Sequence, residues 1–224
     1  MSEAPKFYTE ETSIDDLLKS VPADTKVLSL CEGHTSQATK REVAECMEEL
    51  GRLGFTHLAM EAFGIDAQEA LNEYQESSTN KGRKGLLKYL KRGLGGWLTK
   101  GPELYMGIVD AAIKNGIKVR GIALPQKEES KFSGVFELRD LLDRKDIHMA
   151  GAVASILNEN PSNRVITFTG TNHVIYGKSM GGYLRESKID TFNVVFLGKD
   201  YPTEELTKRK GNLLYDCVIQ LSEK

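Results

Sequence analysis

The sequence predicts an α/β fold in which helices cover both faces of a mostly parallel central sheet, a three-layer α/β/α arrangement. Short apolar runs typical of buried strands alternate along the chain with longer amphipathic stretches. The stretches between the runs are long enough for the helical crossovers that parallel strands require. The 224 residues suffice for one sizeable hydrophobic core, and no low-complexity linker divides them, so we expect a single α/β domain over residues 1–224.

The first half of the chain alternates helix and strand patterns. Strands are predicted where brief apolar runs follow turn residues such as Pro22 and Asp24. Helices are predicted where apolar residues recur on one stripe, and a glycine such as Gly54 follows the stripe as a C-cap. In chain order, the predicted elements are a short capped helix from Ser13 to Leu18, a strand from Lys26 to Cys31, a helix from Ser36 to Leu53, a strand from His57 to Glu61 and a helix from Gln68 to Glu76.

The second half continues the same alternation after a basic segment at residues 77–102. Gly116 is expected to end the first helix of this half, and Pro125 to stop the strand that follows. In chain order, the predicted elements are a helix from Pro102 to Asn115, a strand from Ile117 to Leu124, helices from Phe136 to Leu142 and from Ile147 to Leu157, strands from Arg164 to Thr169 and from Phe192 to Leu197, and an edge strand from Leu214 to Leu221.

Composition excludes several classes of protein. The formal net charge of −2 gives no global field that would favour nucleic acid, so no nucleic-acid partner is expected. Three cysteines without CxxC spacing argue against a disulfide framework and fit a reducing compartment. The amino terminus has no apolar signal region, and no stretch approaches the ~20 apolar residues of a membrane-spanning helix. A cytoplasmic location is therefore expected, whereas the oligomeric state is not encoded in any pattern we recognise.

Polar side chains follow three of the predicted strands. The first strand runs into Cys31-Glu32-Gly33-His34, the second ends at Glu61, and the fourth runs into Gly170-Thr171-Asn172-His173. Ligands of open α/β sheets bind outside the carboxyl ends of parallel strands, so Glu32, His34, Glu61 and His173 are expected to share one rim and to be catalytic. Because His173 follows a Gly-Thr-Asn turn, its side chain is expected to face solvent in the crevice, and its loss should cost little stability, under about 1 kcal/mol. His57 begins its strand and is expected to lie at the opposite rim with a structural role.

These residue types permit two kinds of chemistry. Two imidazoles and a carboxylate are a plausible ligand set for zinc, manganese, cobalt or iron. His34 and His173 would be ligands, Glu61 a ligand or the general base, and Glu32 would complete the shell or orient a ligand. A bound divalent metal would lower the pKa of its water to about 7, and a carboxylate outside the ligand set would act as general base. Without metal, a His/Glu pair would act directly on the substrate as acid and base.

At these residues the chain resembles a known superfamily. Glu32-Gly33-His34 resembles the GExH motif of erythromycin esterases, ChaN-type haem-binding proteins and Tiki/TraB proteins, although Cys31 replaces the motif's glycine. Leu58-Ala-Met-Glu61 resembles the second-strand glutamate of that superfamily, and Gly170-Thr-Asn-His173 its later GxxH motif. Arg144-Lys-Asp-Ile-His-Met-Ala150 is similar to its RDxxMA helix start, and the segment holding Trp97 and Tyr105 is similar to the linking segment of ChaN-like proteins.

The resemblance implies a three-layer α/β/α fold and a site at the same four residues, but it does not select one function. Members include hydrolases, metal-dependent proteases and haem binders. We expect a metal-dependent hydrolase acting on an ester, amide or phosphorylated small molecule. The alternatives are a haem- or ligand-binding module of the ChaN type and an effector-like domain that binds a membrane or a partner. The amino terminus lacks the lipoprotein cysteine of a surface haem-uptake protein, and Cys31 is expected to be a buried apolar residue.

The basic segment at residues 77–102 contains seven Lys or Arg, six glycines and no acidic residue. Within it, residues 81–101 place leucines at helical spacing, so the segment could lie on a membrane, bind a partner, cover the sheet or close over the site as a lid. The lid hypothesis makes Lys88 and Arg92 candidate contacts to an anionic substrate. Trp97, Tyr105 and Arg144, which lie in the segments that carry the resemblance, are further candidate substrate contacts.

Overall fold

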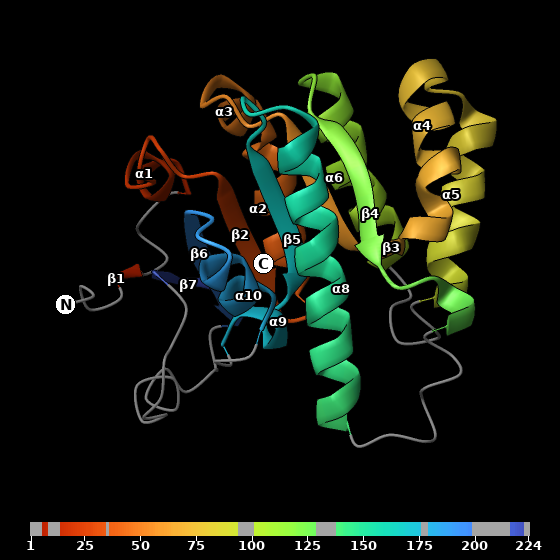
Figure 1. Cartoon of the computed structure of the whole chain (residues 1–224). Helices are drawn as coiled ribbons and strands as arrows, with labels where there is room; N and C mark the ends of the chain where they lie inside the picture. The colour runs from red at the N-terminus through yellow and green to blue at the C-terminus, as the bar shows by residue number, and fades with distance from the viewer. Residues whose placement is uncertain are drawn as a thin grey trace.

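The described residues form a parallel sheet of seven strands in the order β1-β7-β6-β2-β5-β3-β4 (Figure 1). The computed structural model describes residues 6–8, 14–34, 36–93, 101–128, 138–175, 179–198 and 216–221. The strands are β1 (Lys6–Tyr8), β2 (Val27–Glu32), β3 (His57–Gly64), β4 (Lys118–Ala123), β5 (Val165–Gly170), β6 (Thr191–Gly198) and β7 (Cys217–Leu221). The predicted three-layer α/β/α fold is confirmed.

Helices pack on both faces of the sheet (Figure 1). One face is covered by α8 (Leu138–Glu159) and α10 (Met180–Glu186), with the short α9 (Asn172–Ile175) following β5. The opposite face is covered by α1 (Ile14–Lys19), α2 (Gln37–Glu45), α3 (Met47–Arg52) and α6 (Gly101–Lys114). Beside β4 lie η1 (Ile65–Ala67), α4 (Gln68–Ser77) and α5 (Asn80–Gly93). No helix among the described residues is long and apolar enough to cross a membrane.

The sheet separates two hydrophobic cores because successive side chains of a strand point to opposite faces. On β3, Leu58 and Met60 join the core under α2, α3 and α6, whereas Ala59 between them joins the core under α8 and α10. The central strands β2 and β5 are buried along their whole length, which explains why their sequences read as unbroken apolar runs.

The strand order brings three polar strand ends together. β5 lies between β2 and β3, and Glu32 at the end of β2 pairs in register with Gly170 at the end of β5. The chain leaves all three strands at the same rim because they are parallel. β3 continues past its predicted end at Glu61 to Gly64, but its pairing with β5 ends at Met60, so Glu61 still lies beside Gly170. Glu32, Glu61 and the segment from Gly170 to His173 therefore meet there.

Several element boundaries differ from those predicted. The helix expected from Ser36 to Leu53 is interrupted at Cys46, which closes α2 and begins α3. The two helices expected at Phe136–Leu142 and Ile147–Leu157 form one helix, α8, because neither proline nor glycine lies between them. The strand expected at the sheet edge, β7, is internal because β1 pairs with its outer side. The strand β1 itself was not predicted.

Candidate active site

His173 lies at the centre of the candidate site. It stands in α9, directly after the turn that leaves β5, and only 3% of its side chain is exposed. Its Nε2 lies 3.0 Å from Glu61 Oε1, and its Nδ1 lies 2.7 Å from Asp146 Oδ1 on α8. Burial alone would lower the pKa of His173, but the two carboxylates reverse this and raise it to about 10. His173 is therefore an imidazolium held between two acids, and not the solvent-facing side chain that the sequence led us to expect.

Glu61 is the second member of the cluster, and both of its carboxylate oxygens have partners. Oε1 contacts His173 and also Lys145 Nζ at 3.1 Å, and Oε2 accepts a hydrogen bond of 2.8 Å from the backbone N–H of Gly170. Burial would raise the pKa of Glu61, but these partners hold it well below its ordinary value. Glu61 is thus a fully engaged carboxylate that fixes the positions of its neighbours.

His34 is placed differently from His173. The residue is largely exposed and follows β2 directly, while its ring edge lies against Gly170. A methyl group placed on Gly170 would lie 2.7 Å from His34 Nε2 and 3.5 Å from Glu61 Oε2, so a glycine is needed for the imidazole to sit there. Partial enclosure of the ring and the nearby cations Lys40, His173 and Lys145 lower the pKa of His34, despite the opposing effect of Glu61. At neutral pH His34 is therefore an uncharged imidazole at the rim.

Glu32 is buried beneath this rim and holds the turn that carries His34. Its Oε2 accepts a hydrogen bond of 2.6 Å from Lys40 Nζ, and its Oε1 accepts one of 2.7 Å from the hydroxyl of Tyr105. Lys40 also donates to the backbone carbonyls of His34 and Ser36, each at 2.9 Å. Burial raises the pKa of Glu32 to about 7, against the lowering effect of Lys40. Glu32 acts on the rim through Lys40 and does not face it.

Three residues that were not predicted complete the arrangement: Asp146, Lys145 and Lys40. Asp146 and Lys145 stand within the segment similar to the RDxxMA helix start, which was the one signal that could have revealed them. Lys40 is only 1% exposed, which is rare for a lysine unless its ammonium is paired. It stands eight residues after Glu32, on a helix that reads as amphipathic, so its contact with the carboxylate is visible only in three dimensions.

The four candidate substrate contacts that the structure describes are not brought together. Lys88 and Arg92 are exposed on α5, whose leucines Leu86, Leu87 and Leu90 pack into the core. This packing fits a covering helix. Tyr105 is buried and bonded to Glu32, Arg144 is exposed on α8, and Trp97 lies outside the described residues.

The predicted metal ligands do not fit a resident divalent cation in this arrangement. Both ring nitrogens of His173 already contact carboxylates, and Lys145 and His173 neutralise Glu61. Among the residues that the structure describes, no three His, Cys, Asp or Glu side chains are arranged to hold a metal ion. Cys31 is fully buried, and burial raises the pKa of its thiol to about 12, so it is a structural thiol and not a thiolate ligand.

The arrangement suits proton transfer beside a fixed cluster of charges. An uncharged imidazole can accept a proton at neutral pH, and His34 presents one at the rim. Next to it, the imidazolium of His173 and the ammonium of Lys145 flank Glu61 in a largely buried cluster, which the carboxylates hold in place.

Comparison with protein families gives one match. A family model described as "Haem-binding uptake, Tiki superfamily, ChaN" matches residues 21–145. No curated protein matches the chain by sequence.

Solved structures show the same fold at low sequence identity. The type III effector HopBA1 is 16% identical with a TM-score of 0.66, and the alignment covers 96% of each chain. ChaN of Campylobacter jejuni, whose structure is described as showing cofacial haem binding, is 16% identical with a TM-score of 0.58, over 84% of this chain and 87% of that chain. The erythromycin esterase EreC in an open conformation is 14% identical with a TM-score of 0.59, over 85% of this chain and 74% of that one.

Proposed function

The chain belongs to the ChaN haem-binding uptake family of the Tiki superfamily, and from that premise we propose that it is a hydrolase of an ester, amide or phosphorylated small molecule, with His34 as general base. One observation carries this proposal. An uncharged, exposed imidazole stands beside a buried cluster of Glu61, His173 and Lys145 at the carboxyl ends of three adjacent strands. Ligands of parallel α/β sheets bind at this end.

In the proposed reaction, His34 removes a proton from a water molecule as the water oxygen attacks the carbonyl or phosphoryl centre. The same proton then passes from His34 to the departing oxygen or nitrogen, so that the imidazole is uncharged again at the end. Negative charge that develops on the substrate is stabilised by the ammonium of Lys145, because both ring nitrogens of His173 already contact carboxylates. Little reorganisation is needed because Glu61 already holds this ammonium in place.

The supporting residues explain why the motif contains a glutamate that does not face the rim. Glu32 fixes Lys40, and Lys40 holds the backbone carbonyls of His34 and Ser36. The turn after β2 is thereby held in one conformation, and the imidazole is positioned over Gly170. General-base catalysis depends on such positioning because the base must lie within hydrogen-bond reach of the attacking water.

The proposal is tested by replacing His34 with glutamine and measuring turnover on a panel of chromogenic carboxyl esters, anilides and phosphate esters. Turnover of any accepted substrate should fall by about 10²–10⁴, the usual contribution of a general base. The thermal midpoint should change little, because His34 is exposed. His57→Gln is the matched control, since His57 lies at the opposite end of β3 and should leave turnover unchanged.

Two outcomes would contradict the proposal. Turnover by the His34→Gln variant within threefold of wild type would remove His34 from the mechanism. Loss of activity on dialysis against a chelator, restored by zinc or manganese, would replace direct acid–base catalysis with metal-assisted hydrolysis.

The second candidate function is haem binding without catalysis, which the description of the family and the neighbouring Campylobacter jejuni structure favour. Of the two histidines at this rim, His173 has both ring nitrogens engaged, so His34 is the candidate ligand for haem iron. The same two variants discriminate. Titration with haemin should give a Soret shift in wild type and His57→Gln that His34→Gln lacks if this function holds, and no saturable shift in any of the three if the protein is a hydrolase only.

A further inference from the structure

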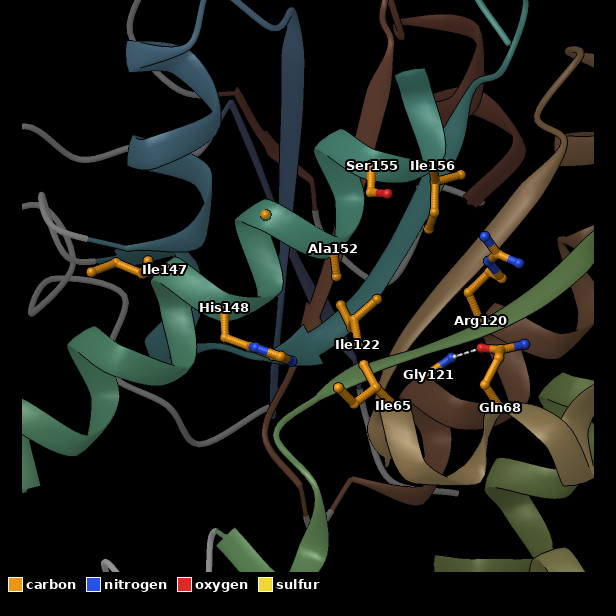
Figure 2. Close-up of a pocket in the computed structure, with 11 residues that line it drawn as sticks. Ile65, Gln68, Arg120, Gly121, Ile122, Ile147, His148, Ala152, Ser155 and Ile156 are labelled. Carbon is orange, nitrogen blue, oxygen red and sulfur yellow. Dashed lines mark hydrogen bonds between the residues drawn. The ribbon is translucent and has the colours of Figure 1, made fainter. Parts of the chain in front are cut away.

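A hollow lies between α8 and the edge strand β4 (Figure 2). Its volume is about 530 Å³, which lies within the range of small-molecule sites. The walls are largely apolar and come from η1, β4 and α8, with Ile65, Ile122, Ala152 and Ile156 as main contributors. None of Glu32, His34, Glu61 and His173 lines it.

Two large apolar side chains at the rim of this hollow are unusually exposed to solvent. Ile65 is 44% exposed and Ile147 is 51% exposed, and these are the large hydrophobic side chains that stand out as exposed among the described residues. Both line the same hollow although they are more than eighty residues apart in the chain. Apolar side chains that gather at one concave place are typical of a binding site, whereas scattered ones need no explanation.

One polar group in the hollow lacks a partner. His148 Nε2 is buried and makes no hydrogen bond with any described residue, and the imidazole extends from α8 toward β4 and Ile122 (Figure 2). His148, Ala152 and Ser155 lie at helical spacing, so the ring and the Ser155 hydroxyl face the hollow from one side of α8. Buried polar groups are normally hydrogen-bonded, so an unpaired ring nitrogen beside a cavity points to a ligand that pairs with it.

The other polar groups of the hollow are already engaged. Arg120 forms an ion pair with Glu159, and the Gln68 side chain accepts a hydrogen bond of 2.9 Å from the backbone N–H of Gly121. Neither residue offers an uncompensated charge to a ligand. The chemistry that remains is an apolar surface with one imidazole and one hydroxyl.

We propose that this hollow binds an uncharged apolar molecule that bears a hydroxyl group, of the phenol or alcohol class, with the hydroxyl bonded to His148. A hydroxyl both donates and accepts, so it pairs with the ring nitrogen in either tautomer of the imidazole. The apolar body of the molecule would cover Ile65, Ile122 and Ile147. This site is independent of the proposed hydrolysis at the strand ends.

The test uses 4-ethylphenol as the probe and ethylbenzene as its hydroxyl-free match, each titrated into ¹⁵N-labelled protein with amide spectra recorded. The phenol should shift the signals of Gly121, Ile122 and Gly151 and should bind about tenfold more tightly than ethylbenzene, the effect of one net hydrogen bond. In His148→Phe this preference should vanish while ethylbenzene still binds.

Two variants that fill the hollow complete the test. Ala152→Trp should abolish the shifts by both probes. If that variant does not fold, Gly151→Leu replaces it, because a side chain at Gly151 meets no atom within 4 Å of its Cβ and removes a helical glycine. Equal affinity of the two probes for wild type, or unchanged phenol binding by His148→Phe and the filled variant, would overturn the proposal.

Discussion

His34 and His173 lie at the same rim, yet their surroundings shift their pKa values in opposite directions. Partial enclosure and neighbouring cations lower the pKa of His34, whereas Glu61 and Asp146 raise the pKa of His173 to about 10. A pair of titratable groups whose environments separate their pKa values is typical of acid–base sites. The assignment of the base to His34 and of fixed positive charge to His173 follows from this separation.

The stability of the protein should depend on pH through His173. Its pKa is raised from 6.5 in the unfolded chain to about 10 in the fold, so its stabilising contribution is complete below pH 6.5 and is lost as pH rises through about 10. Urea unfolding of wild type between these pH values should show a decline on the order of 2–5 kcal/mol beyond that of His173→Gln, which lacks the titrating ring. Parallel declines of the two proteins would show that His173 is not protonated in the fold.

The sequence identified both histidines as site residues but did not reveal their burial or their protonation. A position after a strand end is enough to place His34 and His173 at one rim, because parallel strands end together. The partner that buries His173 is Asp146, 27 residues earlier on another helix, and no local pattern links the two. The expectation that His173 faces solvent was wrong for this reason. Its loss would leave two carboxylates without their shared cation, at a cost of about 3–5 kcal/mol and not under 1 kcal/mol.

At the scale of elements, side chains of α4 form hydrogen bonds with the backbone groups along the free edge of strand β4. Gln75 accepts a hydrogen bond of 2.6 Å from the backbone N–H of Val119 and donates one of 3.1 Å to the carbonyl of the same residue. Gln68 accepts from the N–H of Gly121 at 2.9 Å and also donates to Val119 at 3.3 Å. These amides take the place of a further strand, which protects the edge from pairing with another chain.

Replacing Gln75 with alanine should leave backbone groups at this edge without their side-chain partner. The backbone N–H of Val119 would lose its partner, and the free energy of unfolding should fall by about 1–3 kcal/mol. Gln37→Ala on α2 is the matched control, because it removes the same side chain from a helix that borders no strand edge. Both variants are compared by urea unfolding and by light scattering, where Gln75→Ala should self-associate more. A stability equal to that of the control would mean that solvent replaces the amide at no cost.

The helices and strands predicted most accurately are those whose sequence pattern is local. The apolar runs of β2 and β5 are unbroken because both faces of these strands are buried, and each was predicted to within one or two residues. The break at Cys46 was missed because the hydrophobic stripe continues from α2 into α3 without a glycine or proline at the break. The three-residue strand β1 was missed because it owes its existence to pairing with β7, more than two hundred residues away in the chain.

For the whole molecule, the order of the strands determines the site. The sequence predicts a parallel sheet, but it does not reveal that β5 inserts between β2 and β3. This order puts Gly170 beside Glu32 and within reach of Glu61, and it thereby assembles the cluster from segments about thirty to one hundred and forty residues apart. The family match covers residues 21–145 and stops before this last strand end, so the three-dimensional arrangement supplies the position of His173.

At neutral pH the candidate site pairs an uncharged His34 with a charged His173. The most direct measurement is an NMR titration of the histidine ring signals between pH 5 and 10, with the four histidines assigned by single replacements. His34 should titrate below its ordinary pKa of 6.5, and His173 should keep the chemical shifts of an imidazolium through pH 8 and lose its proton near pH 10. A His173 that is neutral at pH 7, or a His34 that remains protonated there, would contradict this pairing.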